Sequence, residues 1–162
     1  MVNDNEALHQ VLNSFAEIDT PKILVHGGGV HATTIATKLG YSPKMIDGRR
    51  ITDSNMLEVA VMSYAGLSNK KIVALLQELN VDAIGLSGAD GNSITAIKRS
   101  VNKIDYGFAG DIVSINLNFF KNLLNGDLVP VMNAITHNKK GQLLNTNADT
   151  IAAEIAKAMS LY

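Results

Sequence analysis

Residues 22–29 read Lys-Ile-Leu-Val-His-Gly-Gly-Gly, and this stretch decides the fold. A short apolar run that ends in three glycines predicts a buried strand followed by a tight turn. The helical spacing that begins near His31 completes a strand–turn–helix unit. Glycine lets the backbone approach a ligand closely, and a helix N-terminus presents free N–H groups to an anion. The turn therefore indicates a site for a small anion, with a purely structural turn as the equal alternative.

Helical and extended segments alternate along the rest of the chain. Apolar residues at helical spacing predict a first helix, which Asn3 or Asp4 would cap and which ends before Pro21. Further helices are expected over residues 30–39, from Asp53 or Ser54 to about 79, over 117–125 with Gly126 as the terminating glycine, and from about 147. Strands are expected at residues 83–86, 94–98, 111–115 and 128–132, with a hairpin at Asp47-Gly48 and a polar segment at 133–142. This alternation predicts an α/β fold, with a largely parallel sheet sandwiched by helices and residues 1–162 forming a single domain.

The composition excludes several classes of function. Of the 162 residues, 46% are hydrophobic and 18% charged, and the net charge is −1. Scattered Lys and Arg and few aromatics argue against nucleic acid, and no apolar run approaches the roughly 18 residues of a membrane span. The absence of cysteine excludes disulfides and thiolate metal sites, and the four histidines show no metal-ligand spacing. We therefore expect a cytoplasmic protein with no membrane, nucleic-acid or metal partner of its own.

Two polar stretches beside the predicted strands are candidates for ligand binding. Arg49 and Arg50 lie on the hairpin arm, and an arginine can grip a carboxylate with two parallel hydrogen bonds. Only one of two neighbours on a strand can face a site, and a solvated surface pair is the alternative. Asn147 fits the N-cap of the last helix, with Asp149 in its first turn. Capping does not explain Asn145, which could supply amide hydrogen bonds to a polar ligand.

Three other features favour a structural explanation. His26 could act as a base, but a histidine beside a turn is more commonly satisfied by the backbone. The segment 87–91 is best explained as a plain loop, since too few carboxylates converge there to bind a cation. Leu75, Leu76 and Leu79 belong either to the core or to a helical dimer seam.

Taken in order over nearly the whole chain, these motifs resemble those of the N-acetylglutamate kinases of the amino-acid kinase superfamily. The matching blocks are Val25–Gly29 (VHGGG), Gly48–Asp53 (GRRITD), Gly85–Gly91 (GLSGADG), Gly107 with Gly110-Asp111, Val129–Val131 (VPV) and Asn145–Asp149 (NTNAD). Each block is weak alone, and their order and spacing make the resemblance specific.

The resemblance implies phosphorylation of the side-chain carboxylate of N-acetyl-L-glutamate, or another N-acylglutamate, by MgATP in arginine biosynthesis. It implies that Gly28 and Gly29 bind this substrate through backbone N–H groups. It also implies that Arg50 grips the α-carboxylate and that Asn145 contacts the substrate. Asp149 is implied as the catalytic aspartate, which would orient the lysines that neutralise the transferring phosphoryl group.

The sequence also departs from the family pattern. The family opens with a strand that carries Lys-x-Gly-Gly, and it ends with an ATP-binding lobe that supplies a second lysine. We therefore expect the acyl-amino-acid-binding lobe of such a kinase, truncated at both ends, without firm ATP or Mg²⁺ binding and inactive alone. A non-catalytic acyl-amino-acid-binding or assembly module is the alternative, and a sister kinase acting on another acceptor is disfavoured by the 48–53 block. The acyl group, acetyl or succinyl, stays open, and a family-like homodimer would form through the helix at 67–79.

Overall fold

The computed structural model of the chain describes residues 5–46 and 48–160. Asn3 and Asp4, expected to cap the first helix, and Asp47 of the hairpin turn lie outside these residues. The elements are, in order, α1 (Asn5–Ala16), β1 (Leu24–Val25), α2 (Gly29–Lys38), β2 (Met45–Ile46), β3 (Arg49–Arg50), α3 (Ser54–Ala60), the π-helical η1 (Val61–Ser68), α4 (Asn69–Glu78), β4 (Ala83–Leu86), the 3₁₀ turn η2 (Asp90–Asn92), β5 (Ile94–Lys98), β6 (Gly110–Ile115), α5 (Leu117–Asn125), β7 (Val129–Met132), β8 (Ile135–His137), β9 (Leu143–Asn145) and α6 (Ala148–Ser160).

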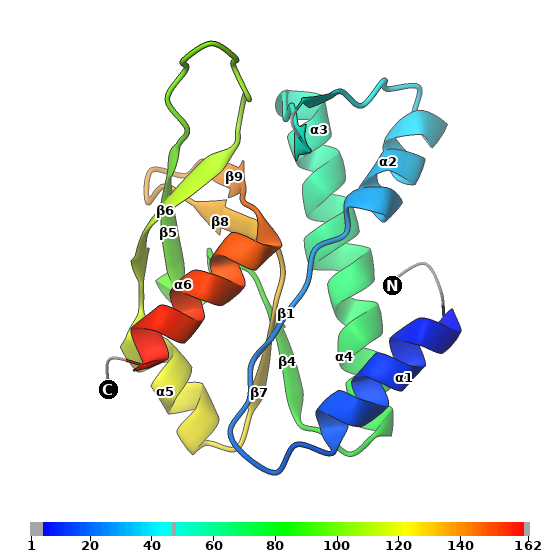
Figure 1. Cartoon of the computed structure of the whole chain (residues 1–162), viewed down its shortest axis with the longest axis vertical. Coiled ribbons are helices and arrows are strands. Elements are labelled where there is room, and N and C mark those ends of the chain that lie inside the picture. Colours follow the sequence, from blue (N-terminus) through cyan, green and yellow to red (C-terminus); the bar gives the residue numbers. More distant parts are fainter. Residues whose placement is uncertain (1–4, 47, 161–162) are drawn as a thin grey trace.

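A three-stranded parallel sheet in the order β1-β7-β4 lies at the centre of the molecule (Figure 1). Side chains of a strand alternate between its two faces, so neighbours on β7 enter different cores. Val131 packs with Leu12 of α1 and Leu76 of α4, whereas Met132 packs with Phe120 of α5 and Ile151 of α6. Helices therefore cover both faces of this sheet, which confirms the predicted α/β sandwich.

A second sheet of four strands, in the order β6-β5-β8-β9, lies above the first. In this sheet β5 pairs in parallel with β8, and the other two pairings are antiparallel. Strand β8 falls inside the segment 133–142, which was expected to be a polar connection. Thr136 is the reason that this strand was not predicted. It is a polar residue, yet it is fully buried, and its hydroxyl lies 2.8 Å from that of Thr146. A polar side chain can be buried when its hydroxyl is hydrogen-bonded, but the sequence then lacks the apolar residue by which a buried strand is predicted.

The long helical stretch from residue 54 to 78 begins as predicted, because the Asp53 carboxylate accepts a hydrogen bond from Met56 N at 2.8 Å. Its middle, η1, is π-helical, with i→i+5 hydrogen bonds that shift the side-chain positions along the helix. Leu76 is fully buried against α1, which favours the core explanation for this residue over a dimer seam. Met62 and Leu67 are the exposed large apolar side chains of the π-helical segment, each about half accessible.

The end of α5 differs from the expected glycine stop. Gly126 has φ −94°, which is not left-handed, and Asp127 takes φ +58° instead. Aspartate is one of the few non-glycine residues that adopt this conformation readily, because its short polar side chain bonds locally. The helix ends at Asn125 as predicted, and the left-handed residue that follows it is Asp127 instead of Gly126.

Candidate functional site

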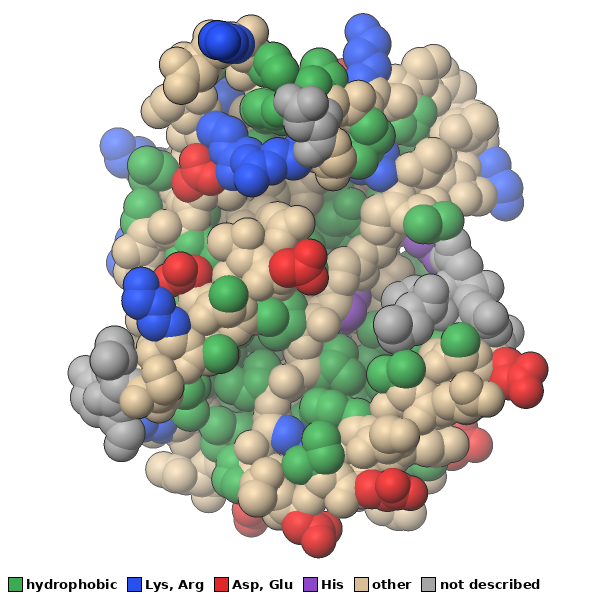
Figure 2. Space-filling model, viewed as in Figure 1, with side chains coloured by type: hydrophobic (Ala, Val, Ile, Leu, Met, Phe, Trp, Pro, Cys, Tyr) green, Lys and Arg blue, Asp and Glu red, His purple; other side chains and the backbone are tan. Residues whose placement is uncertain are grey.

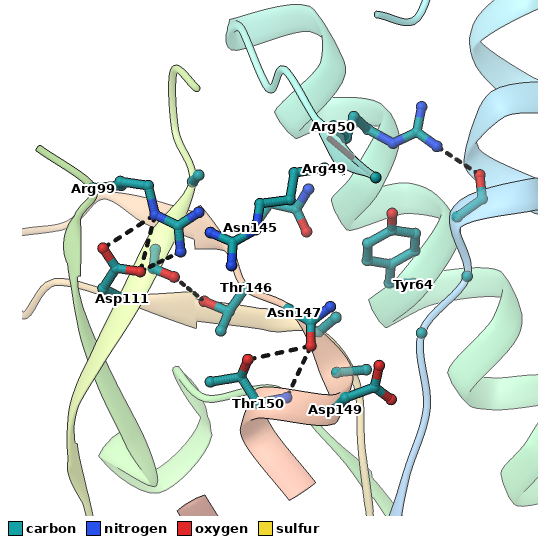
Figure 3. Close-up of a pocket in the computed structure, with 18 of the residues that line it drawn as sticks. Arg49, Arg50, Tyr64, Arg99, Asp111, Asn145, Thr146, Asn147, Asp149 and Thr150 are labelled. Carbon is teal, nitrogen blue, oxygen red and sulfur yellow. Dashed lines mark hydrogen bonds and ion pairs between the residues drawn. The ribbon is translucent and has the colours of Figure 1, made fainter. Parts of the chain in front are cut away.

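A pocket with a volume of about 370 Å³ opens where the β1–α2 turn, the β2–β3 hairpin and the start of α6 meet (Figure 3). All five residues singled out from the sequence as site residues line it: Gly28, Gly29, Arg50, Asn145 and Asp149. On this face the Lys and Arg side chains gather near one end of the molecule, beside a hollow, and most Asp and Glu side chains lie toward the other (Figure 2). The chain thus brings together residues that are more than 100 positions apart.

The glycine turn is shaped by close packing. Strand pairing continues past β1, since His26 N donates to Met132 O at 2.9 Å. Gly28 then precedes α2 with an extended φ of 176°, which any residue can adopt. A Cβ on Gly28 would lie 2.6 Å from Cδ1 of Tyr64, closer than real Cβ contacts. Gly28 is therefore required by the neighbouring ring, and its lack of a side chain leaves the start of α2 open to the pocket.

His26 ties this turn to the long helix. Its Nδ1 lies 2.7 Å from Gly27 O, and its Nε2 lies 3.0 Å from Nδ2 of Asn69, which also donates to Val131 O. The carbonyl can only accept and the amide nitrogen can only donate, which defines the neutral tautomer with the proton on Nδ1. Burial lowers the pKa of His26 and outweighs the backbone hydrogen bond that raises it. The structure supports the backbone-satisfied explanation of this residue over a catalytic base.

Because the folded pKa of His26 lies below its ordinary value of 6.5, the unfolded chain binds more protons than the native state as the pH falls below that value. We expect the free energy of unfolding contributed by His26 to be complete above pH 6.5 and to be lost as the pH falls toward the lower folded pKa. The measurement is urea unfolding of the wild type and His26→Gln at several pH values. Gln does not titrate, so this variant should lose less stability between neutral and acid pH. Parallel profiles would contradict the assignment.

Arg50 is half-buried and offers a donor to the pocket. Its Nη2 donates to Gly29 O and to Thr33 Oγ1, both at 2.8 Å, which holds the guanidinium against the start of α2. Its Nη1 is buried and has no hydrogen-bond partner among the described residues. Arg50 also lies beside the hydroxyl of Tyr64, where its positive charge opposes the rise that burial gives the pKa of that phenol.

Arg49 corrects the expectation that only one arginine of the pair can face the site, since both line the pocket. Each strand of this hairpin has only two residues, and Arg49 is exposed at its tip. A long flexible side chain on so short a strand is not held to one face. Figure 3 shows Arg49 reaching toward Asn145, whereas Arg50 turns toward α2.

The opposite wall is built from β9 and the start of α6. Asn145 Nδ2 donates to Thr52 Oγ1 at 3.0 Å, and its backbone N donates to Phe108 O at 2.9 Å. Phe108 N in turn donates to Thr52 O at 2.6 Å. Asn145 therefore lines the pocket and at the same time joins three distant segments of the chain.

Two helix N-termini face the pocket, and both carry a partial positive charge. Asn147 caps α6 as predicted, because its Oδ1 accepts from Thr150 N at 2.9 Å. Asp149 lies in the first turn of that helix. The starts of α2 and α6, together with Arg49 and Arg50, make the pocket attractive to anions despite the charge of Asp149.

Arg99 and Asp111 form an ion pair at the rim, with Arg99 Nε lying 3.1 and 3.2 Å from the two carboxylate oxygens. The hydrogen bond to Asp111 raises the pKa of Arg99, whose guanidinium also lies 5.7 Å from the ring centre of Tyr106. The pair neutralises itself, so Arg49 and Arg50 dominate the field inside the pocket.

Arg99 and Tyr64 are among the lining residues that sequence reasoning did not single out. Arg99 follows β5 and carries no motif. Tyr64 lies on the π-helical segment, where the usual helical spacing does not say which side chains share a face. Asp111 belongs to one of the blocks that carried the resemblance, although no role followed from it.

The chemistry of the pocket is recognition of a small polyanion, with backbone N–H groups, arginine and an amide as donors. Among the described residues there is no group of three or more His, Cys, Asp or Glu that could hold a metal ion. Within the same part of the chain, no helix is long and apolar enough to cross a membrane.

Comparison with known proteins agrees with this fold and identifies the family. The sequence pattern of the amino acid kinase family matches residues 1–161, and the chain belongs to this family. It is 51% identical to the acetylglutamate kinase of Parabacteroides distasonis over its full length, and it spans 64% of the length of that relative.

Solved structures share the fold at lower identity. A Streptococcus mutans protein superposes with a TM-score of 0.81 at 24% identity, over 97% of this chain and 63% of its own. The N-acetylglutamate synthase of Neisseria gonorrhoeae, solved with coenzyme A and N-acetylglutamate, gives 0.76 at 21%, over 98% of this chain and 36% of its own. These two likenesses establish the fold alone.

Proposed function

We propose that this chain provides the acceptor-binding part of an acetylglutamate kinase, which transfers a phosphoryl group from ATP to the side-chain carboxylate of an N-acylglutamate. The observation that carries the proposal is a pocket in which Arg50 lies close to the N-termini of two helices, α2 and α6. An N-acylglutamate has two carboxylates and an amide, which match these donors. The 51% identity to an acetylglutamate kinase supports the same acceptor.

The roles that we propose for the five residues are those that the resemblance to N-acetylglutamate kinases implies. Backbone N–H groups of Gly28 and Gly29 would bind the ligand at the start of α2, and Arg50 would hold the α-carboxylate. Asn145 would contact the ligand from the opposite wall. Asp149 would act as the catalytic aspartate by orienting lysines around the transferring phosphoryl group.

ATP with Mg²⁺ is the donor that such a kinase uses, and it supplies the phosphoryl group and part of its charge neutralisation. No lysine is among the residues that line the pocket in the described part of the chain. Loss of one preorganised donor of this kind costs about 3–4 kcal/mol of transition-state stabilisation, or 10²–10³ in rate. We therefore propose that residues 1–162 alone bind the acceptor but neither bind ATP firmly nor catalyse the transfer.

Calorimetry and a coupled kinase assay on the 162-residue chain test this proposal together. N-Acetyl-L-glutamate should bind, ATP with Mg²⁺ should give no heat of binding, and no ADP should form. N-Acetyl-L-glutamine, which lacks the side-chain carboxylate, is the matched control ligand and should bind more weakly. Failure to bind the acceptor would refute the acceptor role, and ATP-dependent phosphorylation would refute the inactivity.

A non-catalytic acyl-amino-acid-binding or assembly module is the second candidate, because the substrate-side residues alone fill the pocket. A family-like homodimer through the helix at 67–79 fits this candidate and the first. Exposed Leu67, with the neighbouring Met62, would supply its apolar contact, since Ile72 and Leu76 are buried within the chain. Sedimentation equilibrium of the purified chain measures this assembly directly.

A further inference from the structure

Tyr64 stands at the wall of the pocket without a role in the proposed chemistry. It lies in the π-helical segment η1, is 5% exposed and packs its ring against Gly28. Its hydroxyl points toward the hairpin strand that carries Arg50 (Figure 3). π-Helical turns are rare and occur frequently at functional sites, because they turn a side chain away from the position that an α-helix would give it. This geometry directs Tyr64 into the site.

The hydroxyl of Tyr64 and the guanidinium of Arg50 are both left with hydrogen atoms to donate. Arginine has no acceptor atom, so it cannot receive the O–H of a neighbouring tyrosine. The oxygen of this hydroxyl lies beside Arg50 and can accept from it, whereas no described residue accepts the O–H hydrogen in turn. Burial raises the pKa of Tyr64 more than the charge of Arg50 lowers it, so the phenol keeps its proton at neutral pH.

The O–H of Tyr64 and the positive charge of Arg50 lie side by side on one wall, and a ligand group that meets both must accept a hydrogen bond and carry negative charge. A carboxylate has two oxygens with about four lone-pair positions and can accept from both donors at once. A neutral acceptor such as a water molecule would satisfy the hydroxyl but would leave the charge of Arg50 uncompensated. The wall is thus built for a negatively charged, two-oxygen group.

We propose that Tyr64 is a substrate-binding residue, whose hydroxyl and the guanidinium of Arg50 together hold the α-carboxylate of the acylated amino acid. The proposal rests on the proposed function and deepens it, because it assigns one carboxylate of the ligand to one wall of the pocket. Tyr64 then has two separate tasks: its ring supports Gly28, and its hydroxyl selects for an α-acid. A tyrosine that served the core alone would need only the ring.

Tyr64→Phe separates the two tasks, since it keeps the ring and removes the hydroxyl. Ligand-observed NMR, which reads millimolar affinities, gives Kd for N-acetyl-L-glutamate and for N-acetyl-L-isoglutamine, whose α-carboxylate is an uncharged amide. Loss of a hydrogen bond to a charged group should weaken binding of the diacid roughly 10- to 100-fold. The α-amide should lose about threefold or less, since it offers no charge. Tyr41→Phe, at an exposed tyrosine outside the pocket, is the control and should change neither affinity.

The outcomes distinguish the inference from the function on which it rests. If Tyr64→Phe binds the diacid as the wild type does, or weakens both ligands equally, the assignment of the hydroxyl to the α-carboxylate is wrong and the proposed function stands. If the wild type binds neither ligand, the proposed function fails and the inference fails with it. Selective loss of the diacid, with the native circular dichroism spectrum retained, supports the inference.

Discussion

Arg50→Ala is expected to weaken binding of N-acetyl-L-glutamate on the order of 10²–10³-fold, because it leaves a carboxylate in the pocket without its charged partner. The substitution also removes the two hydrogen bonds from Nη2 to Gly29 O and Thr33 Oγ1, so the start of α2 loses its restraint. Both effects act in the same direction on affinity. Calorimetry at a fixed salt concentration is the measurement.

Lys44→Ala is the matched control for this prediction. It removes one positive charge from the opposite arm of the same hairpin, and Lys44 is exposed and does not line the pocket. Long-range attraction between exposed charges is screened by salt, so the control should change affinity by about twofold or less. An Arg50→Ala variant that binds within fivefold of the wild type would contradict the role of this arginine.

Gly28→Ala is expected to destabilise the fold by about 1–3 kcal/mol, the usual cost of forcing an extra carbon into a packed site. The added Cβ would lie 2.6 and 3.0 Å from Cδ1 and Cε1 of Tyr64, and an aromatic ring held in a core cannot yield cheaply. Displacement of that ring also disturbs the pocket, so affinity for the acceptor should fall as well. Urea unfolding and calorimetry on the same samples measure both quantities.

Gly27→Ala is a control one residue away. The Cβ there would meet Ala148 Cβ at 3.7 Å, an ordinary contact, and no strained backbone conformation opposes it. Stability should stay the same or rise by about 0.4–1 kcal/mol through the loss of freedom in the unfolded chain.

Adding Tyr64→Leu to Gly28→Ala should recover part of the lost stability by making room for the Cβ. Equal stability of the two alanine variants would show that the ring does not constrain the turn.

Local signals predicted most of the fold because they lie within single elements. The Asp53 cap and the Asn147 cap each bond to a residue three positions away, so the sequence alone can reveal them. Strand β8 could not be found in this way. Its signal depends on Thr136 meeting Thr146, and only the tertiary structure supplies that partner.

The sequence predicted some of the residues of the site, and the structure adds other residues that line the same pocket. Gly28, Arg50 and Asn145 lie on one pocket as expected. Tyr64 was missed because the π-helical turn departs from the 3.6-residue period on which sequence reasoning relies. Arg49 was assigned away from the site because strand alternation was applied to a strand of two residues.

The hydrogen bonds that join Thr52, Phe108 and Asn145 also set an order of events during folding. Thr52 and Asn145 are 93 positions apart, and the segment at Phe108 lies between them in both sequence and space. Closing such long loops costs conformational entropy, and the favourable contacts that compensate for this cost form only once the loop is closed. Pairings of this kind therefore form late. During synthesis, the pocket cannot close until residue 145 has left the ribosome. A ligand that binds there consequently stabilises the completed fold and gives no help to its earlier intermediates.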